Sequence, residues 1–478
     1  MQNAPPTVVI LGIPFHNVSF DEAVAWARQR IRSRQPGYIA TANMDFVMQS
    51  WRDPELQRIL LEADLVVADG IPIVWLSALL GPRLKARVTG SDLVPLLAQM
   101  ARDEGFSIYN LGGAAGVPEK AAAALVRRFP GLRLAGCYSP PWAPLLEMDH
   151  ATILAKLQAA NPDLLLVAFG APKQEKWVSL HVRQWKVPLA IGVGGSLDFL
   201  AGVQKRAPRI VQRLAMEWFW RMCSDPPRLV GRYLRNIAFF FQALFRLQLI
   251  FWQKDHPQPG IEPHSPLHSM AQVEPFVPLT DAAQAEAFCA RIAERPADRP
   301  VVLDLAGRPW LSSLEQGALL RLTTRLRRRQ QPCILAGAGS RVRNMLAWCH
   351  LTNYLEVAGT NEDLCTRIAS WSASTRQPRI QSDPSGRTTV PMPAELTAAN
   401  LDTFRLMIDD CAIFHRSRER VLDASATRFI DSSSIGYFIR LKKQASEQDC
   451  TLFMTGVQPS VRRILHIARA DAILLGPE

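Results

Sequence analysis

The chain has 478 residues, of which 48% are hydrophobic and 21% are charged, so about two to four globular domains with ample cores are expected. Its eight cysteines are scattered without a C-x-x-C pair. That spacing argues against a zinc site and a disulfide framework and favours a reducing compartment. The first residues contain no basic stretch followed by a long apolar run, so we expect no signal peptide.

The net charge of +12 is concentrated in one segment. Residues 203–254 carry ten Lys or Arg against two acidic residues, a net charge of +8, and end in an aromatic-rich run at 237–252. This run of 16 residues is shorter than the roughly 20 that a spanning helix needs. A basic segment with such a helix predicts contact with an anionic membrane surface, and a terminal helix packed on its own domain is the alternative. No nucleic-acid-binding motif accompanies the charge, so nucleic acid is not an expected partner.

Residues 1–253 alternate short apolar runs with amphipathic helical patterns. The apolar runs are VVILG (8–12), YIATAN (38–43), LVVADG (65–70), SIYNLGG (107–113), LRLAGCY (132–138), DLLLVAFG (163–170) and LAIGVGG (189–195). This alternation predicts an α/β domain with a Rossmann-like, doubly wound parallel sheet, in which these runs are the strands.

Two segments in the second half of the chain are copies of one another. An offset of 119 residues places Val302–Asp304 on Val421–Asp423 and Ser313 on Ser432 without a gap. The shared order of strand, loop, helix, strand, loop and helix predicts a duplicated small α/β domain. The predicted boundaries are 254–272 for a linker rich in Pro and His, 273–372 for the first copy, 373–388 for a second linker and 389–478 for the second copy.

Polar residues follow the strands predicted in residues 1–253. Thr41 and Asn43 end one apolar run, and Asp69 ends the next. Ligands of open α/β sheets bind where such strands end, so these side chains are candidates for substrate contacts. Asp69 is the best candidate for a general base, because the following Gly70 lets a substrate approach the backbone closely. The alternatives are helix capping by Asp69 and turn formation by Thr41 and Asn43.

Further candidates lie in loops and at a helix start. Arg87 suits a diphosphate or an acceptor phosphate, with a surface salt bridge as the alternative. Gln174 follows Pro172 at a helix start, where a neutral amide suits recognition of uracil or a sugar. Lys173 and Glu175 flank it and are expected to be charges on the helix surface. The glycines that would let a nucleotide approach the backbone are Gly112, Gly113 and Gly194.

No D-x-D pair occurs in residues 1–253. Metal-dependent sugar transferases commonly use that pair to hold the diphosphate through a divalent cation. We therefore expect neither a metal nor another cofactor, and we expect cationic side chains to stabilise the departing diphosphate.

Several strings in residues 1–253 resemble, in order, those of the WecG/TagA/CpsF glycosyltransferases (glycosyltransferase family 26). They include TANMDFV, ADLVVADGIPIVW, RVTGSDL, FGAPKQEKW, GVGGSLDFLAG and EWFWRM. The resemblance implies inverting transfer of an N-acetylmannosamine-type or glucose-type sugar from UDP to a polyprenyl-diphosphate-linked saccharide, at the cytoplasmic face of the membrane, in cell-surface or exopolysaccharide synthesis. It also implies that Asp69 is the catalytic aspartate. By position, the arginines implied to cover the active site are Arg221, Arg228 and Arg232.

Phe429–Gly436 resembles the D-S-S-G loop of STAS domains, small α/β domains of the anti-sigma-factor-antagonist fold. The resemblance implies that Ser433 is a phosphoacceptor, although Ser434 stands where the family has glycine. Phosphate there would add negative charge where a protein partner docks, and a kinase would be a further partner. The first copy has Leu314 at the phosphoacceptor position, so we expect it to be a degenerate copy with a structural or docking role.

The leading hypothesis is a membrane-associated glycosyltransferase with a tandem STAS-like regulatory tail. The alternative is a catalytically silent scaffold in which the STAS-like repeats bind proteins. A nucleotide-dependent oxidoreductase is suggested only by Leu111–Gly116, which does not follow the G-x-G-x-x-G pattern. All candidate residues for chemistry precede Lys254, so we expect the tail to be dispensable for basal transfer.

Overall fold

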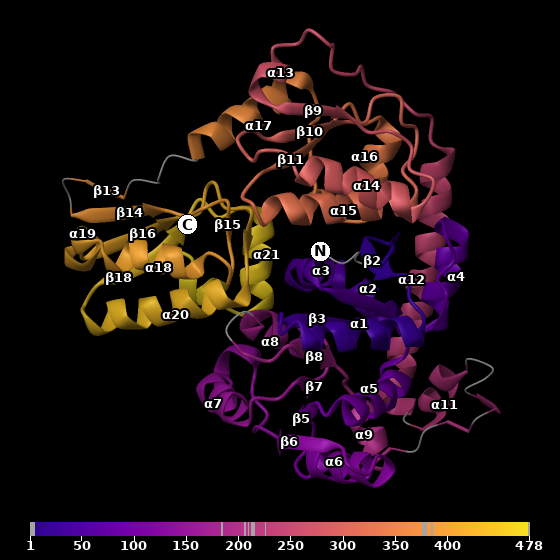
Figure 1. The fold of residues 1–478 in the computed structure, drawn as a ribbon. Coiled ribbons are helices and arrows are strands. Elements are labelled where there is room, and N and C mark those ends of the chain that lie inside the picture. Colours follow the sequence, from indigo (N-terminus) through magenta and orange to yellow (C-terminus); the bar gives the residue numbers. More distant parts are fainter. Residues whose placement is uncertain are drawn as a thin grey trace.

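The computed structural model of the chain describes residues 5–182, 185–204, 207–208, 210–211, 216–224, 226–374, 380–383 and 386–476. These residues form an N-terminal unit up to residue 252, a middle unit over 253–374 and a C-terminal unit from residue 380. Figure 1 shows the middle and C-terminal units lying against different sides of the N-terminal unit.

The N-terminal unit is built on a six-stranded parallel sheet with the order β4-β3-β8-β7-β5-β6. The strands are β3 Gly37–Ala42, β4 Leu65–Ala68, β5 Ser107–Gly112, β6 Arg133–Tyr138, β7 Leu164–Ala168 and β8 Leu189–Gly192. Successive residues of a strand point to opposite faces. In β7, Leu165 and Val167 join one core cluster while Leu164 and Leu166 join the other, so both faces of the sheet are buried. The predicted doubly wound α/β fold is confirmed.

Helices cover both faces of this sheet. Those whose apolar residues join one cluster are α1 Phe20–Arg32, α5 Gly90–Glu104, α6 Val117–Arg128 and α9 Ser196–Leu200. Those that join the other are α2 Met44–Ser50, α3 Pro54–Glu62, α4 Ile71–Leu80, α7 His150–Ala160 and α8 Lys173–His181. The unit continues through α11 Glu217–Ser224 and ends in α12 Pro226–Trp252.

The middle and C-terminal units are small α/β structures. The middle unit contains α13 Leu267–Met270, β9 Gln272–Pro275, α14 Ala282–Ala293, β10 Val301–Asp304, α15 Ser313–Arg327, β11 Cys333–Ala336, α16 Ser340–Trp348, β12 Glu356–Val357 and α17 Asn361–Ser374. The C-terminal unit contains β13 Gln381–Ser382, β14 Arg387–Pro391, β15 Glu395–Leu396, α18 Leu401–Asp409, α19 Ala412–Arg416, β16 Glu419–Asp423, β17 Phe429–Ile430, α20 Ser432–Glu447, β18 Thr451–Thr455, α21 Pro459–Ile467 and α22 Asp471–Leu474. Their main sheets have the orders β12-β11-β10-β9 and β13-β14-β16-β18.

The offset of 119 residues carries elements of one unit onto elements of the other. It moves the start of α15 from Ser313 to Ser432, the first residue of α20. It moves α16 onto α21 over the whole length of both helices, and β11 onto the last four residues of β18. The sequence repeat therefore corresponds to a repeat of secondary structure.

The first apolar run, VVILG, does not join the parallel sheet, so its predicted place there is wrong. Its strand β1 (Thr7–Ile10) pairs antiparallel with β2 (Ile13–His16) in a separate hairpin. Gly12 takes a positive φ of 86° in the turn between them, a conformation that favours glycine. On its other side β1 packs against α15 of the middle unit, where Gly317 leaves room for the Thr7 carbonyl. Strand β1 is thus packed on the middle unit and is not part of the parallel sheet.

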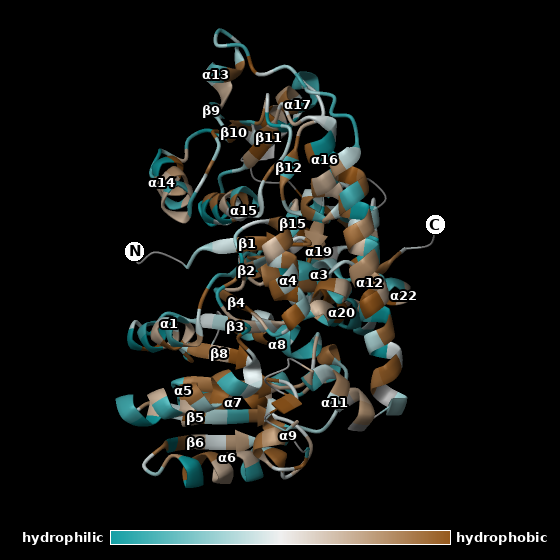
Figure 2. Cartoon of the chain, turned by 90° about the vertical axis from the view of Figure 1, so that its right-hand side faces the viewer, coloured by the Kyte–Doolittle hydropathy of each residue, from teal (hydrophilic) through white to brown (hydrophobic). Residues whose placement is uncertain are grey.

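Helix α12 is longer than the aromatic run from which it was predicted. It is continuous over 27 residues, because the basic stretch before residue 237 is helical too. Its part Leu229–Trp252 is long and apolar enough to cross a membrane by length and composition alone, so the argument that the helix is too short is wrong. One face is packed in the protein, where Ala243, Leu247 and Ile250 are buried. Figure 2 shows the helix running along one side of the molecule, from α11 to α16.

The segment expected as the first linker, 254–272, is ordered against the middle unit. The Asp255 carboxylate accepts the backbone N–H of Arg341 at 3.1 Å, and the backbone N–H of Ile261 donates to Asp304 at 2.8 Å. This segment also contains α13 and the start of β9. These contacts fix the middle unit beside the end of α12.

Candidate active site

The candidate residues from the strand ends lie at the carboxyl ends of the parallel strands. They are on both sides of the switch point, where the chain reverses the direction in which it adds strands to the sheet. From β3 the chain moves outward to β4, and it returns from the other side to place β8 next to β3. The Thr41 hydroxyl at the end of β3 donates to the Gly192 carbonyl at the end of β8, at 3.1 Å. Such a switch point is where open α/β sheets bind ligands.

Asp69 lies at the end of the neighbouring strand β4. Its backbone N–H donates to the Ala42 carbonyl at 2.9 Å, which holds it beside the end of β3. The following helix, α4, has Gly70 as its N-cap, so Asp69 lies one residue before the capping position. A Cβ on Gly70 would lie 3.7 Å from the Asn43 Cβ, which places the backbone after Asp69 against Asn43.

Asn43 has a structural task as well. Its amide oxygen accepts the backbone N–H groups of Asp45 at 3.0 Å and of Phe46 at 3.2 Å, as the N-cap of α2. The alternative of local turn chemistry is therefore correct for this oxygen. A ligand in contact with Asn43 would meet its amide nitrogen, which makes no hydrogen bond to the described residues.

Gln174 and Glu175 lie in the first turn of α8, next to Gly192. Both are buried, and Glu175 has an exposed fraction of 0%, so its expected place on the helix surface is wrong. Trp177 and Val178 face the core one turn later, and a helical period of 3.6 residues puts Gln174 and Glu175 on that same face. The sequence therefore contained a signal that Gln174 and Glu175 are buried.

Glu175 is joined to two polar groups. Its Oε1 accepts the Tyr38 hydroxyl at 3.2 Å and the Gln174 amide nitrogen at 2.7 Å. Burial raises the pKa of the Glu175 carboxyl to about 7, against the lowering effect of these hydrogen bonds. Burial, followed by the nearby Glu175 charge, also raises the pKa of Tyr38. Tyr38 was not expected as a partner of Glu175 from the sequence.

The three candidate glycines lie at strand ends with positive φ angles. These angles are 97° for Gly112, 86° for Gly113 and 46° for Gly194. A Cβ on Gly112 would lie 2.8 Å from the Ala168 carbonyl oxygen, so glycine there permits the close approach of β5 and β7. A Cβ on Gly194 would face the Gln174 amide oxygen at 3.8 Å, which puts this backbone beside the buried amide.

The cationic candidates are only partly brought to this site. Arg87 pairs with Glu217 of α11 at 3.1 Å in a largely buried ion pair, not the surface salt bridge of the alternative, and this pair ties the basic segment to the loop before α5. The guanidinium of Arg232 lies 5.4 Å from the centre of the Tyr233 ring on α12. The side chains of Arg221 and Arg228 lie outside the described residues. Sequence reasoning missed Glu217 as the partner of Arg87.

Ser433 is in the first turn of α20, in the C-terminal unit. Its hydroxyl donates to the carboxylate of Asp431, which is also the N-cap of this helix. Its neighbour Ser432 hydrogen-bonds Glu55 of α3 through both its N–H and its hydroxyl, at 2.7 and 2.8 Å. The predicted loop therefore lies against the N-terminal unit.

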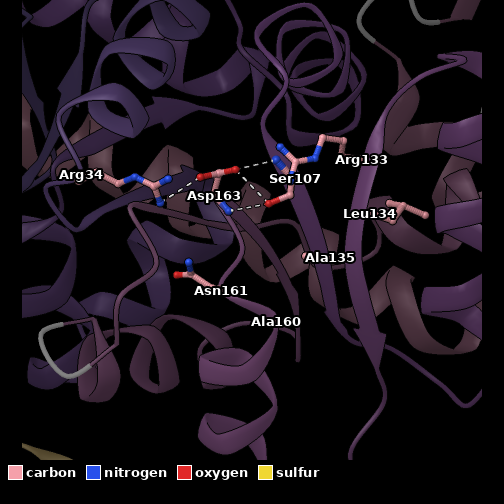
Figure 3. A pocket seen from close by; sticks show the side chains of 8 residues that line it. All are labelled: Arg34, Ser107, Arg133, Leu134, Ala135, Ala160, Asn161 and Asp163. Carbon is pink, nitrogen blue, oxygen red and sulfur yellow. Dashed lines mark hydrogen bonds and ion pairs between the residues drawn. The ribbon is translucent and has the colours of Figure 1, made fainter.

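The hollow drawn in Figure 3 lies at the other ends of the strands from the candidate residues. It has a volume of about 300 Å³ and lies at the amino ends of β5, β6 and β7. Asp163 there pairs with Arg34 at 3.0 Å and accepts the Ser107 hydroxyl at 3.0 Å (Figure 3). Arg34, Asp163 and Ser107 satisfy one another there, and the candidate residues lie at the opposite ends of the strands. Within the described ranges, no group of three or more His, Cys, Asp or Glu is placed to hold a metal ion.

The chain is similar to known proteins over two regions. Residues 8–253 match the glycosyl transferase WecG/TagA/CpsF family, and residues 377–476 match the STAS domain. Two relatives are named N-acetylglucosaminyldiphosphoundecaprenol N-acetyl-beta-D-mannosaminyltransferase. The one from Bacillus spizizenii is 32% identical over 48% of this chain and 82% of its own length. The one from Staphylococcus aureus is 30% identical over 50% of this chain and 91% of its own length.

Among solved structures, 33% of the chain aligns with 30% of the murine Solute Carrier 26 family member A9 anion transporter, at 16% identity and a TM-score of 0.17. So slight a likeness carries no argument. The family match over residues 8–253 and the relatives lead to the same assignment. The chain belongs to the WecG/TagA/CpsF glycosyltransferases, and it carries a STAS domain in its C-terminal unit.

Proposed function

We propose that the protein transfers an N-acetylmannosamine-type or glucose-type sugar from a UDP-sugar to a polyprenyl-diphosphate-linked saccharide, with inversion at the anomeric carbon. The observation that carries the proposal is Asp69 at the end of β4, beside Asn43 and next to the switch point of the sheet. The names of the relatives support a lipid-diphosphate-linked acceptor. The proposed product is a precursor for cell-surface or exopolysaccharide synthesis.

In this reaction Asp69 is the general base. It takes the proton of the acceptor hydroxyl as that oxygen forms a bond to the anomeric carbon of the donor. The bond from this carbon to the UDP oxygen breaks, and UDP leaves with the bonding electrons. Negative charge then grows on the diphosphate, so cations near the leaving group lower the barrier. Arg87 and the arginines of the basic segment are the candidates for this role, namely Arg221, Arg228 and Arg232.

The scaffold alternative has weaker support. A silent scaffold would not need an acidic residue at the end of β4 beside the switch point of the sheet, where Asp69 lies. The tail is better described as an addition to an enzyme. We propose that the middle unit is a degenerate STAS-like copy and that the C-terminal STAS domain is regulatory, with Ser433 as a candidate phosphoacceptor for a kinase.

We also propose that the protein lies on the cytoplasmic face of the membrane. Helix α12 exposes large apolar side chains at intervals of three or four residues, which places them on one face. They are Val230, Leu234, Ile237, Phe241, Phe245, Leu249 and Trp252, and Phe251 is exposed next to the last of them. Because the opposite face is packed on the protein, an orientation along the surface fits the helix better than a crossing one.

The test is a donor screen with the full-length chain and a polyprenyl-diphosphate-linked N-acetylglucosamine acceptor, with products read by mass spectrometry. A hexose or N-acetylhexosamine mass added to the acceptor, with UDP released, is the expected result. The Asp69→Asn variant is the control for a contaminating transferase. If the wild-type chain binds UDP-sugars but adds no sugar to any lipid-linked acceptor, the proposal is wrong.

A further inference from the structure

The carboxyl group of Glu175 is buried at the candidate active site with only one of its two oxygens in use. Oε1 accepts Tyr38 and Gln174, whereas Oε2 has no hydrogen-bond partner among the described residues. A buried polar atom without a partner is costly, so an apolar side chain would serve the core better. Glu175 therefore needs an explanation other than packing.

Its contact with Gln174 fixes the direction of that amide. The Gln174 nitrogen faces Glu175 Oε1 at 2.7 Å. The reversed amide would bring two acceptor oxygens to this distance, which is repulsive. A proton on the carboxyl would sit on the unpartnered Oε2, so Oε1 stays an acceptor in either protonation state.

The amide oxygen of Gln174 is consequently turned away from Glu175. It is buried and has no hydrogen-bond partner among the described residues. It faces Gly194, where a Cβ would lie 3.8 Å away. Gly192 completes the arrangement, because a Cβ there would lie 2.7 Å from the Gln174 nitrogen and 2.9 Å from the Tyr38 hydroxyl. Among the described residues, the site thus holds an acceptor oxygen without a donor.

We propose that Glu175 is a positioning residue that holds Gln174 with its oxygen toward the ligand, so that the site selects a nucleotide-sugar carrying a hydrogen-bond donor at this point. This inference rests on the proposed function. Two donors of a UDP-sugar have the required chemistry, the N3–H of uracil and a sugar hydroxyl. Cytosine has an acceptor at N3, so a contact with the base would reject it by leaving two acceptors face to face.

The test compares three variants of the full-length chain. Glu175→Met removes the acceptor and frees the Gln174 amide to turn. Glu175→Gln keeps an oxygen that can accept both Tyr38 and Gln174, so it is the rescue variant. Asp163→Asn alters another buried carboxyl of the same sheet, at the opposite ends of the strands, and is the matched control. Binding of UDP, CDP and UDP-N-acetylmannosamine is measured by calorimetry, with KM, kcat and melting temperature alongside.

For Glu175→Met we expect roughly tenfold weaker binding of the correct ligand and a higher KM, with a much smaller change in kcat. We expect an unchanged or raised melting temperature, because a poorly satisfied buried carboxyl is removed. Glu175→Gln should recover most of the affinity, and Asp163→Asn should leave it unchanged. A smaller preference for UDP over CDP assigns the contact to uracil, and a loss confined to the UDP-sugar assigns it to a sugar hydroxyl.

If wild type and a folded Glu175→Met variant bind each of the three ligands with the same affinity, the inference is overturned while the proposed function stays intact. Loss of affinity in Glu175→Gln as large as in Glu175→Met would also overturn it, because the acceptor oxygen would then be irrelevant. A wild-type chain that binds neither UDP nor a UDP-sugar would refute the proposed function itself, and this inference with it.

Discussion

Ser313 and Ser432 are equivalent residues of the two repeated units, and both hydrogen-bond the N-terminal unit through their hydroxyls. Ser313 donates to the Leu80 carbonyl at the end of α4, at 2.9 Å. Ser432 donates to the Glu55 carboxylate at the start of α3, at 2.8 Å. Each serine is the first residue of its helix. The two units therefore use the same helix start to dock on different places of the transferase.

The second of these contacts is built around acidic groups. Lys176 bridges Glu55 at 2.8 Å and Asp53 at 2.7 Å. Burial raises the pKa of Glu55, the Lys176 charge lowers it, and the Asp431 charge raises it further. Lys176 belongs to α8, which also carries Gln174, so docking of the STAS domain touches the helix of the candidate binding site.

Negative charge at Ser433 should weaken this docking. The Ser433→Asp variant adds a carboxylate beside Asp431 and Glu55, where like charges repel. We expect faster hydrogen exchange at the starts of α3 and α20, and an altered KM for the donor. Ser433→Ala removes the hydroxyl without charge, and Ser446→Asp adds the same charge at an exposed position near the end of α20. Equal exchange in all three variants would refute this regulatory role.

The Asp69→Asn variant tests the general base. It keeps the shape of the side chain and removes the basic oxygen, so turnover should fall roughly 10²–10⁴-fold while UDP-sugar affinity stays close to that of wild type. Product formation and calorimetric binding measure the two quantities. Asp103→Asn, at an exposed site on α5, is the control. Turnover near the wild-type value would remove Asp69 from its assigned role.

The fold and the position of the site were largely predictable because they depend on local patterns. Short continuous apolar runs marked six strands, and polar residues at their ends marked Thr41, Asn43 and Asp69. The place of β1 was not predictable, since an apolar strand is compatible with a sheet centre or with a hairpin. The position of β1 depends on its contact with Gly317. That residue lies about 300 residues away in sequence, so the contact leaves no local signal.

Side-chain pairing was the other part that the sequence did not reveal. Arg87 pairs with Glu217 inside the N-terminal unit, far away in sequence, and Ser432 pairs with Glu55 across the boundary between two units. Glu175 was misplaced because a charged residue was assumed to face solvent, although the core-facing Trp177 and Val178 indicated a buried face. The surface position of Glu175 was predicted from its residue type, and the helical period would have predicted a buried position.

The raised pKa of Glu175 predicts a stability that depends on pH. The value rises from the usual 4.5 to about 7 in the folded chain. The folded state therefore binds more protons between these values, and stability falls as pH rises from about 4.5 to 7 and stays lower above it. The Glu175→Gln variant lacks this penalty, so its free energy of unfolding should gain up to about 3 kcal/mol relative to wild type at pH 8 and little at pH 4.

Denaturant unfolding of wild type and Glu175→Gln across this pH range measures the difference. The exposed Glu294→Gln variant is the control and should show no such trend. A difference between Glu175→Gln and wild type that is independent of pH, or that grows toward acid, would contradict the buried carboxyl.

Chelation tests how the leaving diphosphate is stabilised. Without a D-x-D pair in residues 1–253, charge stabilisation is assigned to arginines, so transfer should continue in EDTA. Initial rates before and after chelation, and after return of Mg²⁺ or Mn²⁺, are the measurement. Activity that is lost in EDTA and restored by a divalent cation would show that the arginines do not suffice.

The apolar face of α12 predicts binding to anionic membranes through particular side chains. Phe241 and Phe245 are 63% and 64% exposed on adjacent turns of this face, and exposed arginines lie along the same helix. Apolar burial and attraction of Lys and Arg to anionic lipid then act together. The double variant Phe241→Ser, Phe245→Ser should co-sediment less with vesicles of phosphatidylglycerol and phosphatidylcholine than wild type.

The matched control is Leu406→Ser, which removes a comparably exposed apolar side chain from α18. Wild-type binding should also weaken as salt is raised, since the electrostatic part is screened. Equal sedimentation of the double variant and the control would mean that α12 packs against protein and does not touch lipid. Wild-type protein that stays with the vesicles in both high salt and alkaline carbonate would indicate that α12 crosses the bilayer, because a helix on the surface has no hold that survives both treatments.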